Sequence, residues 1–190
     1  MKIAFCATAL ALLGTGSLAD SVKYNLDPSH SQIVFSYDHI GFSTTYGMFS
    51  GFAGEINFDE TDPATSSVSV SMQAKSMITG WEARLGHFMS PDFFDAADDE
   101  MVSFRSTSIE VTGENTALII GDLNLNGITK SVTLDAKLNK ADAHPMANKR
   151  WLGFDATTEL KRSDYGLGAF APAISDKVDV KISLEAMIDG

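Results

Sequence analysis

The sequence predicts an all-β protein, a closed antiparallel β-barrel of about eight strands with one helical segment, and three observations support this. Apolar and polar residues alternate with a period of two along most of the chain after residue 20, as in strands that bury one face. Turn-forming residues such as Asp62-Pro63 and Asn126-Gly127 separate these stretches, so consecutive strands can pair as hairpins. Only one stretch has the spacing of a helix.

The first element is a secretory signal peptide over residues 1–19. It has a basic start, an apolar run from Ile3 to Leu13, and small residues, Ser17 and Ala19, at the positions that an export peptidase reads. The apolar run is too short for a retained membrane anchor, which needs about 20 residues. We therefore expect a cleaved leader and a periplasmic protein.

The remaining residues, 20–190, are expected to form one domain, because no linker or charge block divides them. The only cysteine, Cys6, lies in the leader, so disulfides and thiolate sites are excluded from the exported chain. Cleavage removes Lys2 from the 14 basic residues and none of the 25 acidic ones, which leaves a formal charge of −12. An acidic surface disfavours nucleic acid and anionic membrane headgroups as partners.

Nine stretches of the domain are strand candidates. The last one is the clearest, because its apolar residues alternate strictly with Asp, Lys, Ser and Glu. In chain order the candidates are Lys23–Leu26, Gln32–Tyr37, Phe52–Phe58, Val68–Met72, Met101–Arg105, Ala117–Leu125, Val132–Leu138, Leu152–Leu160 and Val178–Ala186.

The helical segment is expected from Ser76 to Met89, where apolar residues recur at spacings of three and four until Pro91 ends the pattern. The residues with this spacing are Met77, Ile78, Trp81, Leu85 and Phe88. One helix beside about eight half-buried strands suggests a barrel with a helical flap or lid.

The apolar faces of the strands are expected to point into the barrel. An outer-membrane barrel is the alternative, but several strands are too short, aromatic girdles are missing and a helix interrupts the series. We therefore expect no stable membrane insertion. A barrel of this size either fills its interior or leaves room for one ligand, and the mixture of large residues such as Phe35 and small ones such as Gly54 leaves both open.

Several ordered segments resemble the signature of the YceI-like family. They are Asp27–Phe35 with His39–Ser43 and Gly47–Phe49, Pro91–Asp95 with Val102–Ser106, Gly121–Lys130, and Arg162–Gly166 with Ser175, Asp176 and Val178. The resemblance implies an extended, lipocalin-like barrel, usually exported, that binds polyisoprenoid chains such as quinone tails, or related long amphiphiles. It also implies dimers and responses to pH or other stress in some relatives. We expect no cofactor, only the bound lipid as a ligand.

Two features depart from this resemblance. Asn126 stands where many relatives carry a histidine before the glycine, which puts any polar contact of that position in doubt. The loop from Lys140 to Lys149 is this chain's own.

Candidate ligand-binding residues follow from strand parity, although packing in a plain core explains each of them equally well. They are Ile33, Phe35, Phe52, Ile56, Phe104, Leu134, Phe154 and Ile182. Polar contacts at the mouth of the barrel are expected from His30, His39, Arg162 and Asp164. A strand-end charge pair such as Arg162 and Asp164, next to Gly166, is more often structural. Their presence in a signature segment suggests instead that they order the barrel mouth.

An enzyme is the competing class, and we expect none. The chain has no nucleophile elbow, phosphate-binding loop or dinucleotide fingerprint. His30 and His39 are nine residues apart, which places them on opposite faces of an unbroken strand and argues against a metal site. Asp27, His30 and Ser31 contain the residue types of a catalytic triad, but a local hydrogen-bonded turn is the simpler interpretation.

A barrel that binds a protein partner and no small ligand is a third class. Phe42, Tyr46, Met48 and Phe49 are interpreted as an apolar surface loop that suits a partner, a two-fold homodimer or the entry of a lipid.

Overall fold

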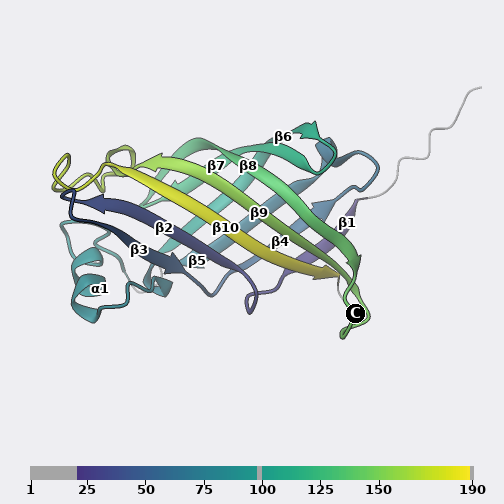
Figure 1. Ribbon diagram of the computed structural model, residues 1–190, viewed down its shortest axis with the longest axis horizontal. Coiled ribbons are helices and arrows are strands. Elements are labelled where there is room, and N and C mark those ends of the chain that lie inside the picture. The colour runs from purple at the N-terminus through teal and green to yellow at the C-terminus, as the bar shows by residue number, and fades with distance from the viewer. Residues whose placement is uncertain (1–20, 98–99, 189–190) are drawn as a thin grey trace, which may run out of the picture.

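The computed structural model describes residues 21–97 and 100–188, in which ten strands form one antiparallel sheet that closes into a long barrel (Figure 1). The predicted signal peptide lies outside the described residues. The strands are β1 (Val22–Leu26), β2 (Gln32–His39), β3 (Ser43–Phe49), β4 (Ala53–Phe58), β5 (Ser67–Gln73), β6 (Met101–Gly113), β7 (Thr116–Leu125), β8 (Ile128–Ala143), β9 (Arg150–Lys161) and β10 (Lys177–Ile188). The helices are the 3-10 turns η1 (Pro63–Thr65), η2 (Ala74–Ser76) and η3 (Arg162–Tyr165), and the α-helix α1 (Glu82–Phe88).

The ten strands occupy eight positions around the barrel. β1 and β2 act as two halves of one bent strand, because β10 pairs with both of them, and β3 and β4 form the bent strand that pairs with it. From β4 to β10 each strand pairs with the next one along the chain. The predicted closed antiparallel barrel of about eight strands with one helix is therefore confirmed.

The barrel has two unlike ends (Figure 1). We call one the helix end, because it holds α1, the β2–β3 hairpin, the β7–β8 hairpin and residues 162–176. At this end His39 forms an isolated bridge with Ile174, and Asn126 Nδ2 donates to the Tyr165 carbonyl at 2.9 Å. We call the other the hairpin end, because it holds the β4–β5 and β6–β7 connections.

Strand β3 is the element that sequence reasoning missed, so the interpretation of its residues as an apolar surface loop is wrong. Phe42 and Tyr46 are exposed, but Met48 is half-buried and Phe49 is buried. The alternation is hidden because the inward positions before Phe49 are a threonine and Gly47. The glycine leaves room for the Phe35 ring, since a Cβ at this position would lie 2.3 Å from Phe35 Cζ and would displace that ring.

The predicted helix over residues 76–89 is correct only in its second half. Before α1 begins, Ile78 donates its backbone N–H to the Met48 carbonyl at 2.8 Å and accepts the Met48 N–H at 3.0 Å. Gly80 then takes a positive φ of 74°, which breaks any continuous helix. Tertiary pairing with β3 has thus overridden the helical spacing.

Candidate functional site

A cavity of about 320 Å³ lies inside the barrel. Its size falls at the lower end of the roughly 300–1,000 Å³ typical of small-molecule pockets. The lining extends from Pro63 and Thr116 at the hairpin end to Phe88 and Ile174 at the helix end, and apolar side chains contribute nearly all of it. The interior is therefore not completely filled by the protein's own side chains.

All eight residues predicted from strand parity line this cavity: Ile33, Phe35, Phe52, Ile56, Phe104, Leu134, Phe154 and Ile182. Their contact with a ligand remains a prediction. The same parity would also have found Val70, Leu123 and Val180, which continue the inward rows. Sequence periodicity carries no signal for lining residues in irregular segments, such as Phe93 and Leu167 at the helix end.

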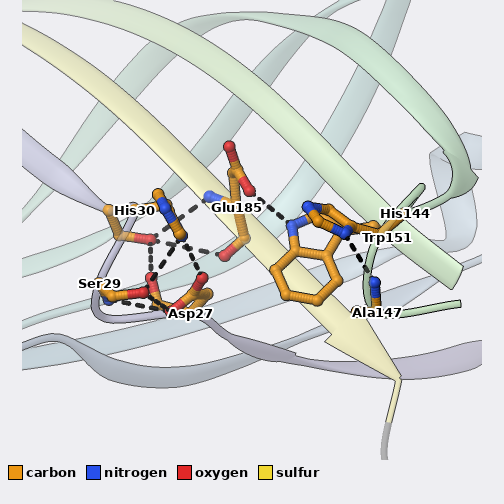
Figure 2. Close-up of polar contacts among 8 residues, drawn as sticks. Asp27, Ser29, His30, His144, Ala147, Trp151 and Glu185 are labelled. Atoms are coloured by element: carbon orange, nitrogen blue, oxygen red, sulfur yellow. Dashed lines mark hydrogen bonds and ion pairs between the residues drawn. The ribbon is translucent and has the colours of Figure 1, made fainter. Parts of the chain in front are cut away.

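The four polar residues expected at the mouth are not brought together. Arg162 lines the cavity at the helix end, while His39 is exposed beside it and does not line it. Asp164 is exposed and accepts a hydrogen bond from Lys130 Nζ at 3.2 Å. His30 lies at the bend between β1 and β2, on the outside of the barrel wall (Figure 2).

Arg162 orders the loop that closes the helix end. Its guanidinium donates to the carbonyls of Ser175 at 2.9 Å, Ala169 at 3.2 Å and Ile174 at 3.1 Å, and also to that of Leu167. Partial burial lowers the pKa of Arg162, and the nearby charge of Asp176 opposes this effect. The interpretation that Arg162 orders the mouth agrees with this geometry, because almost all its donors are used inside the protein.

A second group of polar residues, which we call the bend cluster, consists of Asp27, Ser29, His30, Ser31 and Glu185 (Figure 2). Asp27 Oδ1 accepts from the Ser29 backbone N–H at 2.9 Å and from Ser29 Oγ at 2.6 Å. Asp27 Oδ2 lies 2.6 Å from His30 Nδ1, and Ser31 Oγ donates to the Asp27 carbonyl at 2.7 Å. These bonds hold the turn where β1 becomes β2.

The bend cluster continues across β10 to β9. Trp151 Nε1 donates to Glu185 Oε2 at 2.6 Å, and the Trp151 ring packs against the His144 ring at a tilt of 42°, with 4.7 Å between ring centroids (Figure 2). His144 Nδ1 in turn accepts from the Ala147 backbone N–H at 3.1 Å. The loop expected from Lys140 to Lys149 is shorter in the structure, because Lys140–Ala143 continue β8 and pair with β9. The remaining connection, residues 144–149, is tied to the barrel wall by these contacts.

In the bend cluster, Asp27 and His30 each favour the charged form of the other. Burial alone would raise the pKa of Asp27, but hydrogen bonds from Ser29 and His30 outweigh it, and the pKa lies below its ordinary value. The pKa of His30 is raised, mainly by its hydrogen bond to Asp27 and then by that carboxylate's charge.

The bend cluster does not have the geometry of a catalytic triad. A triad needs the carboxylate on one imidazole nitrogen and the serine on the other. The serine of the sequence candidate, Ser31, donates instead to the Asp27 carbonyl at 2.7 Å, and its neighbour Ser29 shares His30 Nδ1 with Asp27, at 3.1 and 2.6 Å. The interpretation as a local hydrogen-bonded turn is confirmed.

One group of side chains in the described part of the chain could hold a metal ion. Asp27, His30 and Glu185 each offer one ligand atom, and these atoms lie within 4.8 Å of one another. Both Asp27 oxygens, however, are already used by Ser29 and His30. The expectation that the protein binds no metal stays a prediction.

Within residues 21–97 and 100–188, no helix has the length and apolar character needed to cross a membrane.

Comparisons with known proteins agree on one family. A family model described as a YceI-like domain matches residues 24–186. A UPF0312 protein of Ectopseudomonas mendocina is 35% identical over 189 residues, which cover 98% of each chain. Among solved structures, Burkholderia cenocepacia BcnA gives a TM-score of 0.76 at 22% identity, covering 84% of this chain and 98% of that one. A polyisoprenoid-binding domain from Saccharophagus degradans gives 0.68 at 15% identity, covering 87% and 98%. The chain belongs to the YceI-like domain family.

Proposed function

We propose that the protein binds the tail of a polyisoprenoid or another long-chain amphiphile inside the barrel. The observation that carries this proposal is the apolar cavity along the barrel. Each methylene taken out of water contributes about 0.8 kcal/mol, so a long tail needs no charged partner to bind. Ordering and association costs offset part of this gain. The likeness to a polyisoprenoid-binding domain supports the same class of ligand.

The role we propose is binding or carriage, not catalysis, in the periplasm. The leader-like residues 1–19 support this location. The bend cluster gives no support for catalysis, because the hydroxyls of Ser29 and Ser31 donate to Asp27 and hold a turn.

The first test is mass spectrometry of an organic extract from the natively purified protein, compared with Ala156→Phe and Thr157→Phe. Ala156 faces the cavity from β9, so a phenylalanine there would occupy the space of the tail. Thr157 is the next residue of the same strand and is exposed, which makes it the matched control.

We expect a stoichiometric long-chain amphiphile from the wild type and from Thr157→Phe, and a strong loss from Ala156→Phe. A folded wild type that yields no lipid, and binds none when long-chain lipids are added, would contradict the proposal.

A protein-interaction role is the second candidate, favoured by exposed aromatic residues at the helix end. Phe42 is 89% exposed and Trp81 is 64% exposed, more than large apolar side chains usually are. A homodimer through this end would appear as a concentration-dependent mass in sedimentation, and Phe42→Ser would abolish it. A monomer at all concentrations would contradict self-association.

A further inference from the structure

The buried polar side chains of the cavity lining are few. In the described part of the chain they are Ser31, Tyr37 and Tyr165. Ser31 is satisfied, because its hydroxyl donates to the Asp27 carbonyl. Glu114 and Asn115 also border the cavity, at the hairpin end, but both are exposed. The two tyrosines therefore stand out, and both lie toward the helix end.

Tyr37 is held inside the barrel by the parity of β2, where it follows Ile33 and Phe35 on the inward face. It is 9% exposed, and its ring lies 6.3 Å from that of Phe88 between centroids. Tyr165 ends η3 and is 2% exposed. Its backbone carbonyl accepts from Asn126, so the residue is fixed by its main chain and not by its hydroxyl.

Neither tyrosine hydroxyl has a hydrogen-bond partner among the described residues. In that part of the chain, Ser76 Oγ is the side-chain polar atom that is fully enclosed without a partner, so the two hydroxyls border accessible space. A buried tyrosine hydroxyl normally finds an acceptor. Burial raises the pKa of Tyr165, which keeps it a protonated donor. The helix end thus presents two donors that lack acceptors.

The cations near these hydroxyls are mostly engaged. Arg162 donates to four loop carbonyls, and Lys130 pairs with Asp164. Lys161 borders the cavity but is exposed at its rim. A phosphate or carboxylate at this end would lose its hydration without gaining a free buried cation. A neutral acceptor avoids that loss.

We propose that the helix end recognises the polar head of the ligand, and that this head is an uncharged carbonyl group held by the hydroxyls of Tyr37 and Tyr165. This inference rests on the proposed function, since the tail must occupy the cavity. The carbonyl belongs to a ketone, an ester, an amide or a quinone ring. A site that offers hydrogen bonds rejects an analogue that cannot accept them, because its buried donors are then left unpaired.

The test uses three probes with the same isoprenoid tail: farnesylacetone with a neutral ketone, farnesyl diphosphate with an anionic head, and farnesene with no polar head. Affinities for the full mature chain are measured by competition with a fluorescent apolar probe. We expect farnesylacetone to bind about tenfold or more tightly than farnesene, and farnesyl diphosphate to bind no better than farnesene.

Tyr37→Phe and Tyr165→Phe should each weaken farnesylacetone about fivefold and leave farnesene unchanged, because each removes one oxygen. Tyr46→Phe is the matched control, since Tyr46 is 63% exposed on β3. Equal binding of ketone and hydrocarbon, tighter binding of the diphosphate, or unchanged affinity in both variants would overturn the inference while leaving tail binding intact. Failure of all three probes to bind would instead overturn the proposed function.

Discussion

The barrel has two polar regions, the bend cluster within its wall and the tyrosine hydroxyls at the helix end of its cavity, and they differ in how far their hydrogen bonds are satisfied. In the bend cluster, the Asp27 carboxylate has donors on both oxygens, and Trp151 donates to Glu185. At the helix end, Tyr37 and Tyr165 line the cavity without an acceptor in the described part of the chain.

The difference separates structural from functional polarity. A buried polar group whose partners are complete stabilises the fold and has little left for a ligand. A buried donor that borders a cavity without an acceptor stabilises nothing until an acceptor arrives. Variants of the first kind should change stability and leave ligand affinity unchanged, and variants of the second kind should do the reverse.

The largest expected effect on stability is that of replacing Arg162. It tests whether Arg162 is one of the polar groups whose hydrogen bonds are complete within the protein. Arg162→Met removes four hydrogen bonds to loop carbonyls, and we expect it to lower the free energy of unfolding by about 3 kcal/mol. Arg162→Lys should rescue little, because an ammonium lacks the planar fork of donors. Urea denaturation measures both, with hydrogen exchange over residues 163–176. Full stability with lost ligand affinity would instead make Arg162 a ligand contact.

Asp27→Asn should have the next largest effect. The amide cannot accept from Ser29 and His30 as the carboxylate does, so we expect a loss of about 2 kcal/mol in the free energy of unfolding near pH 6. Asp62→Asn is the control, because Asp62 is exposed and makes no side-chain cap bond. Affinity for a tail ligand should be unchanged in both. A loss of ligand affinity in Asp27→Asn alone would contradict the separation between polar groups that stabilise the fold and those that bind the ligand.

The Asp27–His30 pair should also make stability depend on pH. The pKa of His30 is raised, so its contribution is complete below about pH 6.5 and is lost as pH rises through the raised value. The pKa of Asp27 is lowered, so its contribution is present above about pH 3.8 and is lost as pH falls through the lowered value. The advantage of wild type over His30→Gln should therefore peak between about pH 4 and 6.5 and shrink at alkaline pH.

Thermal melts across that range measure the difference, and NMR titration of His30 gives its pKa directly. In Asp27→Asn the pKa of His30 should fall toward its ordinary value, because the hydrogen bond and the charge of Asp27 raise it. An unchanged pKa would show that the contact does not form in solution.

The sequence predicted the regular strands of the barrel wall better than the irregular segments at the helix end. Period-two alternation found nine of the ten strands and all eight lumen candidates, because a buried face imposes its pattern on regular strands. It missed β3, where Gly47 stands at an inward position to make room for the Phe35 ring. It also extended the helix over Ile78, whose backbone pairs with Met48 instead. Both errors come from contacts between distant segments, which local periodicity does not encode.

The site residues divide in the same way. Strand parity identified the apolar residues that line the cavity. It did not single out Tyr37, although Tyr37 lies on the same inward face of β2 as Ile33 and Phe35. Tyr165 and Arg162 reach the cavity from η3, where there is no strand register to follow. The residue types of a polar site were visible in the sequence, whereas the completeness of their hydrogen bonds is a property of the folded chain alone.

The smallest expected effect concerns the far side of the bend cluster. Trp151→Phe keeps an aromatic ring against His144 but removes the N–H that donates to Glu185, so the free energy of unfolding should fall by about 1 kcal/mol. Trp81→Phe is the control, because Trp81 is 64% exposed and its ring contacts Arg84 at the surface. Urea denaturation followed by circular dichroism avoids a change of fluorescence probe. Equal stability of the two variants would mean that the bend cluster ends at Glu185, because the bond to Trp151 would then add nothing to the wall that Asp27 and His30 already hold.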